Sequence, residues 1–285
     1  MAKMENAAVQ IKDTQWLEEN RSKVQIIDSQ PEVYDYLQSH IEGSVYLSDK
    51  LWRTWHDSIP TRYACPEAIG CMLQRAGIDC TLPIAVYSGS GAYSKSGDGL
   101  EAAMFAYSLA RHGVRDIVYI DGGLDKWIKE GRNVTKEFPC MEEKKLSIKI
   151  KPQSELFLTY NQFIEVKNLQ ETFVIDVRPI AVYEHANLWS RPGHIPGAYN
   201  IPWHSFMDSQ NCYLLKPAEQ IKEIAHSIGA VPEKQIVIYC GTGREAAMSF
   251  LVFKWLLGYP NVKLFEGAFT EWCAMRQETK TGREP

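Results

Sequence analysis

The sequence lacks several features that would assign a class of protein at once. Its seven cysteines include no Cys-x-x-Cys pair, and no histidine stands near them at the spacing of metal ligands. An odd number of scattered cysteines is not a disulfide framework. We therefore expect reduced thiols and no metal site. The cysteines are Cys65, Cys71, Cys80, Cys140, Cys212, Cys240 and Cys273.

The chain also lacks a charge of one sign and a long apolar run at its start. The 35 acidic and 31 basic side chains are interspersed and leave a formal net charge of −4. This balance gives no electrostatic footprint for nucleic acid or for an anionic membrane, so an anionic ligand has to be bound by a local site. The first residues, MAKMENAAVQIKD, predict neither a secretory signal nor a membrane span. We expect a cytoplasmic protein.

The sequence does contain an internal repeat of four segments in the same order. In the first half these are KVQIIDSQPEVYDYL, HIEGSVYL, LPIAVYSGSG and DIVYIDGGLDKW. In the second half they are TFVIDVRPIAVYEHA, HIPGAYNI, KQIVIYCGTG and NVKLFEGAFTEW. Chance rarely gives four ordered matches at similar spacings, so the chain is predicted to be a duplication.

Each copy has the pattern of an α/β domain. Short β-branched runs alternate with helical stretches, which predicts a mainly parallel sheet flanked by helices on both faces. With 285 residues, the chain can bury two separate cores. The charged segment MEEKKLSIKIKPQSELF has no counterpart at the start of the first copy. We predict domains at 1–140 and 159–285, joined by a linker at 141–158.

One loop of the second copy carries reactive chemistry. Cys240 follows the predicted strand QIVIY, and Gly241, Thr242, Gly243 and Arg244 lead from it into a buried helix. The glycines allow successive backbone N–H groups to form an anion-binding nest at the helix N-terminus. Because the nest and the arginine lower a thiol pKa, we predict a thiolate near neutral pH. Such a thiolate supports covalent catalysis without a cofactor.

Several segments together resemble the tandem rhodanese family, which includes thiosulfate and mercaptopyruvate sulfurtransferases. The resemblance covers about residues 23–137 and 159–273. It implies two rhodanese-like domains and a ping-pong sulfurtransferase that carries sulfane sulfur as a persulfide on Cys240. The donor is a small sulfur anion, and the acceptor is cyanide, a thiol or an acceptor protein. The matching segments are IDVR, RPGHIPGAYNIP, YCGTGREA and FEGAFTEW.

The resemblance also assigns roles around the loop. The loop residues from Gly241 to Glu245 would set the donor preference, with the Thr242 hydroxyl and the Arg244 guanidinium binding donor oxygens. Glu245 opposes thiol ionisation unless it pairs with Arg244 or turns away in the first helical turn, and we favour the second arrangement. In the first copy, Ser88 stands in place of Cys240, which predicts a catalytically silent domain.

Residues outside the loop are further candidates. Asp176 and Arg178 match the family's Asp-x-Arg, and Arg178 either binds the donor's charge or pairs with Asp176. Arg191 could reach the mouth of the site, whereas His194 is expected to be a structural turn residue. The segment WHDSIP resembles a pocket segment of the family, which makes His56 and Asp57 second-tier candidates.

Alternatives stay open at this stage. The Gly-Thr-Gly loop resembles that of mercaptopyruvate enzymes, but a further arginine of that pattern is absent, so the donor is undecided between thiosulfate and 3-mercaptopyruvate. A phosphatase or arsenate reductase on this fold needs an arginine six positions after the cysteine, where this chain has Ala246. A non-enzymatic binding or regulatory module is the second alternative.

Overall fold

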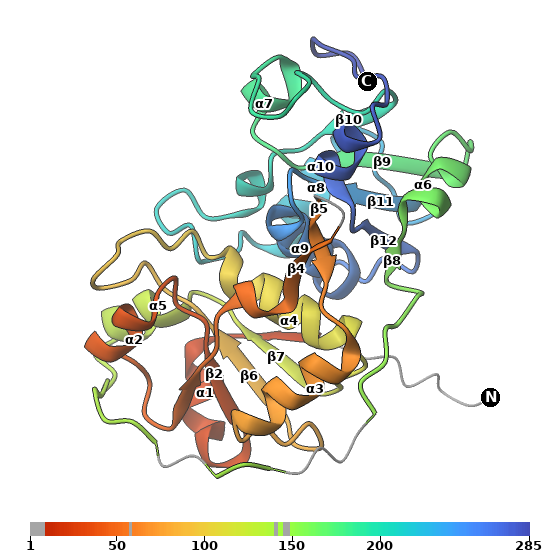
Figure 1. The fold of residues 1–285 in the computed structure, drawn as a ribbon. Coiled ribbons are helices and arrows are strands. Elements are labelled where there is room, and N and C mark those ends of the chain that lie inside the picture. The colour runs from red at the N-terminus through yellow and green to blue at the C-terminus, as the bar shows by residue number, and fades with distance from the viewer. Residues whose placement is uncertain (1–8, 57–58, 140–141, 145–148) are drawn as a thin grey trace, which may run out of the picture. The chain divides into compact units, whose positions relative to one another are not determined.

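The computed structural model describes residues 9–56, 59–139, 142–144 and 149–285 (Figure 1). The chain divides into two compact units, neither of which is continuous in sequence. Unit 1 consists of Met1–Trp52, Ala64–Gln153 and Asp208–Leu215, and unit 2 consists of Arg53–Tyr63, Ser154–Met207 and Lys216–Pro285.

Unit 1 is built on a five-stranded parallel sheet with the strand order β1-β7-β6-β2-β3. Its strands are β1 (Val9–Lys12), β2 (Gln25–Asp28), β3 (Ser44–Tyr46), β6 (Ile84–Tyr87) and β7 (Ile117–Ile120). Its helices are α1 (Thr14–Asn20), η1 (Arg21–Lys23), α2 (Val33–Gln38), η2 (Asp49–Trp52), α3 (Pro66–Arg75), α4 (Leu100–Arg111) and α5 (Gly123–Lys129). The central strands β6 and β7 are buried at every residue, as expected of strands in a sheet that is covered on both faces.

Unit 2 repeats this topology with the strand order β8-β12-β11-β9-β10. Its strands are β8 (Phe157–Leu158), β9 (Thr172–Asp176), β10 (Ala198–Asn200), β11 (Gln235–Tyr239) and β12 (Val262–Phe265). Its helices are α6 (Tyr160–Val166), α7 (Ile180–Glu184), η3 (Trp203–Phe206), α8 (Ala218–Ser227), α9 (Arg244–Leu251), the π-helical turn η4 (Val252–Leu256) and α10 (Ala268–Ala274). Because the two sheets share strand order and direction, the predicted fold class is confirmed.

Two segments do not belong to the unit that the repeat predicts for them. The antiparallel hairpin of β4 (Arg53–His56) and β5 (Ile59–Tyr63) comes from the first repeat but belongs to unit 2. The segment Asp208–Leu215 comes from the second repeat but belongs to unit 1, where the backbone N–H of Gly122 donates to the carbonyl of Tyr213. Strand β8 also lies inside the segment predicted as a linker. The predicted boundaries at 1–140 and 159–285 stay a prediction about which stretches of the chain fold on their own.

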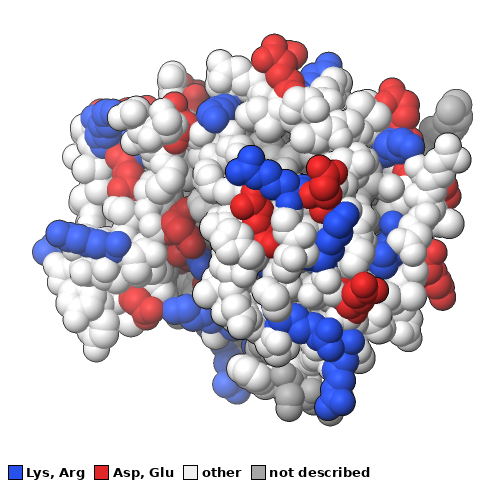
Figure 2. Space-filling view, turned by 90° about the horizontal axis from the view of Figure 1, so that it is seen from above, with Lys and Arg blue, Asp and Glu red and all other residues white. Residues whose placement is uncertain are grey.

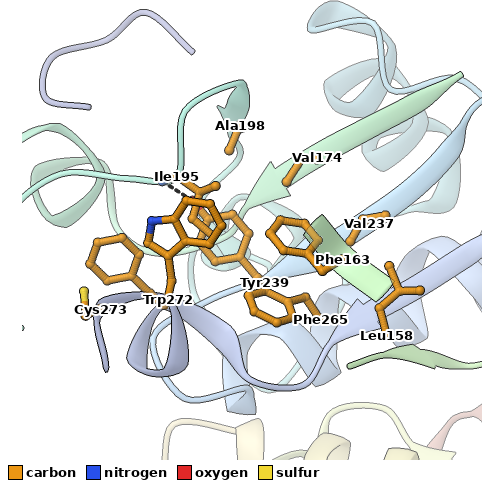
Figure 3. Close-up of a cluster of buried hydrophobic side chains, with 11 residues drawn as sticks. Leu158, Phe163, Val174, Ile195, Ala198, Val237, Tyr239, Phe265, Trp272 and Cys273 are labelled. Atoms are coloured by element: carbon orange, nitrogen blue, oxygen red, sulfur yellow. Dashed lines mark hydrogen bonds between the residues drawn. The ribbon is translucent and has the colours of Figure 1, made fainter. Parts of the chain in front are cut away.

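An aromatic core in unit 2 fixes the strand that leads to Cys240. Tyr239 is the last residue of β11, and its hydroxyl accepts the backbone N–H of Ile195 at 3.1 Å (Figure 3). Phe163 and Phe265 stack in the same cluster with ring centroids 4.2 Å apart. A fully buried strand end holds the residue that follows it in one position.

The helix after Cys240 is buried, as the sequence predicts. The six residues from Ala246 to Leu251 are all buried, and α9 passes directly into the π-helical turn η4. The helical region closes before Gly258, which has a φ of +70°. The loop therefore rests on a helix that is packed on all sides.

One face of the molecule shows no concentration of one charge. On the face drawn in Figure 2, basic and acidic side chains are interspersed. Within the described part of the chain, none of the helices combines the length and the apolar character needed to span a membrane.

Candidate functional site

Cys240 lies in a loop whose backbone N–H groups converge on its sulfur. The backbone N–H of Gly243 donates to Sγ at 2.9 Å. The N–H groups of Thr242 and Ala246 also act on the sulfur through hydrogen bonds. Gly243 has a φ of +105°, a conformation that glycine adopts readily and other residues rarely do. The loop thus forms a nest of N–H groups at the N-terminus of α9.

Two backbone carbonyls fasten the loop to α10. The Cys240 carbonyl accepts the backbone N–H of Phe269 at 2.9 Å. The Gly241 carbonyl accepts from the backbone N–H of Thr270 at 3.2 Å and from its hydroxyl at 2.8 Å. The indole N–H of Trp189 donates to the same hydroxyl at 3.0 Å. The start of the loop, which carries the sulfur, is therefore fixed to α10.

Gly241 is required at its position because Trp189 covers it. A Cβ built on Gly241 would lie 2.3 Å from Cζ2 of Trp189, closer than Cβ contacts occur. We expect Gly241→Ala to displace the loop and to lower the rate of any reaction at Cys240 about 10²-fold. Trp189→Ala in the same chain should restore part of the loss, because it removes the clashing ring.

Gly258→Ala is the matched control for this prediction. It adds a Cβ in the same unit where nothing lies within 4 Å, so only the cost of its φ of +70° remains. Its reaction rate at Cys240 should equal that of the unmodified chain. Equal rates for Gly241→Ala and the unmodified chain would show that the loop tolerates the displacement.

The resting thiol is harder to ionise than the sequence suggests. The pKa of Cys240 is raised to about 12. Burial is the largest cause, the charge of Glu245 also raises the pKa, and the three backbone N–H groups lower it. The side chain is 1% exposed, so the desolvation of a thiolate outweighs the nest. The expectation of a thiolate near neutral pH is therefore corrected for the resting site. Arg244 is the half-buried first residue of α9.

Glu245 stands in the first turn of α9, as the favoured arrangement requires, yet its charge still acts on the sulfur. We expect alkylation of Cys240 by neutral iodoacetamide to accelerate with rising pH through pH 10, because the thiolate fraction is still growing there. Glu245→Gln should move the profile to lower pH. A shift of one pKa unit gives about tenfold faster alkylation at pH 8.

This alkylation is measured on the peptide that contains Cys240, with Glu233→Gln as the control. Glu233 is an exposed residue of unit 2, so its replacement removes an equal charge at the surface. An unmodified chain whose rate levels off near neutral pH would contradict the raised pKa.

Asp176 and Arg178 form a buried ion pair beneath the loop. The Arg178 Nη2 atom lies 2.5 Å from Oδ2 of Asp176, and its Nε lies 2.9 Å from both carboxylate oxygens. The two side chains are 1% and 0% exposed. The guanidinium also donates to the Gly193 carbonyl and lies 4.0 Å from the ring centroid of Phe269. Of the two roles considered for Arg178, the structure shows the ion pair, because Asp176 and the Gly193 carbonyl engage its Nε and Nη2 atoms.

The remaining candidates lie at different places. The backbone of Arg191 hydrogen-bonds the thiol of Cys273, which places it beside α10. His194 is buried, with its ring nitrogens 2.9 and 3.1 Å from two backbone carbonyl oxygens, in agreement with a structural role. His56 is exposed at the end of β4 in unit 2. Asp57 lies outside the described residues.

Sequence reasoning missed two residues that touch the loop. One is Trp189, whose ring packs on Gly241. The other is Arg53 in the hairpin, whose Nη1 donates to the carbonyl of Thr242. Arg53 and Thr242 are 189 positions apart, and no motif of the sequence connects them. Only the assignment of the hairpin to unit 2 brings them together.

In the corresponding loop of unit 1, backbone N–H groups donate to carboxylates of α5 and α2. Ser88 stands where unit 2 has Cys240, and its carbonyl accepts the backbone N–H of Leu124 at 2.8 Å. The Asp125 carboxylate accepts from the backbone N–H of Ser90 at 2.7 Å and from its hydroxyl at 2.6 Å. The Asp35 carboxylate takes two further N–H groups of the same loop. These N–H groups are therefore occupied by anions of the chain itself.

A buried cysteine in a nest of N–H groups, in one half of a duplicated parallel α/β protein, defines a sulfur-centred candidate site. The family model of the rhodanese-like domain matches residues 13–130 and 159–275. The chain therefore belongs to the rhodanese family, as the resemblance implies.

Three similar proteins show how far this likeness extends. A Synechococcus elongatus protein with the provisional name thiosulfate sulfurtransferase is 33% identical over 97% of this chain and 86% of its own. The sulfur carrier protein TtuD of Thermus thermophilus is 27% identical over 91% and 92%. The solved structure of SseA, a 3-mercaptopyruvate sulfotransferase of Escherichia coli, has a TM-score of 0.79 and 25% identity, and the match covers 92% of this chain and 99% of SseA.

Proposed function

We propose that the protein is a sulfurtransferase in which Cys240 accepts a sulfane sulfur as a persulfide and passes it on. The observation that supports this most directly is the set of three backbone N–H groups directed at the Cys240 sulfur. These donors complement an anionic sulfur, and they would serve a persulfide anion in the same loop equally. The names of the relatives agree with sulfur transfer in general.

The chemistry needs only the cysteine and two substrates. The thiolate attacks the outer sulfur of thiosulfate, a new S–S bond forms, and the old S–S bond breaks as sulfite leaves with its electron pair. With 3-mercaptopyruvate the C–S bond breaks instead, and the leaving pyruvate carbon takes up a proton. Cyanide or a thiol then attacks the terminal sulfur, and the thiolate of Cys240 leaves. Bonds and electrons balance in each half without a metal or an organic cofactor.

Both donor classes stay within this proposal. The relatives bear names for thiosulfate and for 3-mercaptopyruvate, and TtuD is named a sulfur carrier protein, which supports a protein as a further acceptor. Thr242, Arg244 and the rest of the loop would contact the donor's oxygens. Phosphatase chemistry has less support, since Ala246 stands where the fold's phosphate-clamping arginine would be.

We propose in addition that the unit carrying Ser88 is silent in this reaction. The Asp125 and Asp35 carboxylates already hold N–H groups of that loop. A sulfur anion would have to displace them and would meet their charge. A serine without an adjacent base is also a weak nucleophile.

Mass spectrometry tests the proposed function directly. The protein is incubated with thiosulfate or with 3-mercaptopyruvate, freed of excess donor and analysed intact and as peptides. A gain of about 32 Da on Cys240 with one donor is the expected result and selects that donor, because attack on the outer sulfur adds one sulfur atom. No gain with either donor on a reduced Cys240 would overturn the proposal and favour a binding module.

A further inference from the structure

Arg53 lies against the Cys240 loop within unit 2. It is the first residue of β4 and pairs with Tyr63 of β5 in the hairpin. Its Nη1 donates to the Thr242 carbonyl. A Cβ built on Gly243 would lie 2.3 Å from its Nη2, so the guanidinium rests on that glycine, whose N–H donates to the sulfur of Cys240. The cation therefore contacts two residues, Thr242 and Gly243, whose N–H groups belong to the nest.

Two of the guanidinium nitrogens are left without acceptors. Nε and Nη2 of Arg53 are both buried, and neither has a hydrogen-bond partner among the described residues. Buried N–H donors of a charged group are costly when unpaired and are rare in folded proteins. Nε and one Nη form the edge of the guanidinium that binds two oxygens of a carboxylate or sulfonate at once. The unpaired edge of Arg53 thus has the chemistry of an oxyanion site.

The position of the Arg53 guanidinium is not needed to attach the hairpin to the rest of unit 2, because a different arginine of the hairpin already provides that contact. Arg62 of β5 lies 2.6 Å from the Glu271 carboxylate of α10, and Glu271 is 1% exposed. The ring of Tyr63 packs against one side of the Arg53 guanidinium, with Cζ 5.3 Å from the ring centroid. The guanidinium is therefore positioned in advance, with its bidentate edge unused.

We propose that Arg53 binds the oxyanion of the sulfur donor, a sulfonate or carboxylate group, through Nε and Nη2 while the donor's sulfur meets Cys240. This inference rests on the proposed function for its natural ligand. The geometry itself concerns any small anion that approaches the sulfur. Arg53 is then a donor-binding residue supplied by the first repeat, and donor selectivity depends on both repeats.

Alkylation of Cys240 by a charged and an uncharged reagent tests this without requiring sulfur transfer. Iodoacetate carries a carboxylate and iodoacetamide does not, while both attack the same sulfur. The rate ratio of iodoacetate to iodoacetamide on the Cys240 peptide should fall about tenfold in Arg53→Met, the effect of one lost charge-assisted contact. Both rates are measured on the same preparation of the folded variant, so differences in protein concentration cancel in the ratio.

Two variants serve as comparisons. Arg53→Lys keeps the charge but not the planar fork, and its ratio should lie between those of Arg53→Met and the unmodified chain. Arg283→Met removes an equal charge from unit 2 at a residue that is 82% exposed, and it should leave the ratio unchanged. A ratio in Arg53→Met within twofold of the unmodified chain would overturn the proposal, as would an equal fall in Arg283→Met.

Donor kinetics then connect the residue to the proposed reaction. Where the unmodified chain forms the persulfide, Arg53→Met should raise the KM for the anionic donor about tenfold and change kcat little, because the contact exists before and during the attack. A changed alkylation ratio without persulfide formation in the unmodified chain would refute the proposed function and leave the anion site standing. Persulfide formation with an unchanged ratio would refute the anion site alone.

Discussion

Cys240→Ser should abolish persulfide formation and lower sulfur transfer by at least about 10³-fold while the protein stays folded. The serine keeps an acceptor for the Gly243 N–H, which otherwise becomes an unpaired buried donor at a cost of about 1–3 kcal/mol. The backbone bond from Phe269 to residue 240 does not depend on the side chain. The variant also recreates the residue type found at Ser88. Intact mass after incubation with donor and thermal unfolding provide the two measurements.

Cys273→Ser is the matched control. Cys273 is the other buried cysteine of unit 2 among the described residues, and it lies in α10. Its replacement should leave the mass gain and the rate unchanged. A persulfide that still forms in Cys240→Ser, or that disappears in Cys273→Ser, would contradict the assignment of the carrier.

The duplication made most of the fold predictable. Four ordered matches predicted two parallel sheets, and the strand orders β1-β7-β6-β2-β3 and β8-β12-β11-β9-β10 agree with a repeated topology. The assignment of the hairpin Arg53–Tyr63 to unit 2 was not predictable in this way. It depends on tertiary contacts such as the Arg62–Glu271 ion pair, and the repeat carries no pattern for these.

The candidate site was predictable where it is local in sequence. Cys240, its glycines and the helix after them form one continuous segment, so their arrangement follows from strand, loop and helix preferences. Trp189 and Arg53 reach the loop from distant segments, which no spacing rule could indicate. The thiol pKa was misjudged because the sequence shows the N–H donors but not the depth of burial, and burial is the larger effect here.

The two repeats differ in what surrounds the buried aspartate at the end of the corresponding strand. At the end of β2, Asp28 accepts hydrogen bonds from neutral partners, Gln30 and Tyr87, and burial raises its pKa to about 7. At the matching end of β9, Asp176 is paired with Arg178, whose pKa is raised by that carboxylate despite the opposing effect of burial. The same strand position thus holds a carboxyl that is mostly neutral at pH 6 in unit 1 and an ion pair in unit 2.

This contrast leads to the largest expected effect on stability. Asp176→Asn removes the anion and leaves the Arg178 cation 1% exposed among Trp189, Tyr239 and Phe269, with only neutral acceptors, the Gly193 carbonyl and the oxygen of the new amide. Breaking a buried pair from one side costs about 3–5 kcal/mol. We expect the free energy of unfolding of unit 2, measured with denaturant at pH 6, to fall by that amount.

The equivalent variant of unit 1 is the control that isolates the charge. Asp28→Asn at pH 6 replaces a mostly neutral buried carboxyl with a neutral amide, so we expect a loss of about 1 kcal/mol, typical of a single neutral hydrogen bond. Adding Arg178→Met to Asp176→Asn should recover part of the stability, because the unpaired cation is removed along with the anion. Equal losses for Asp176→Asn and Asp28→Asn would show that the buried charge of Arg178 is neutralised by groups other than Asp176.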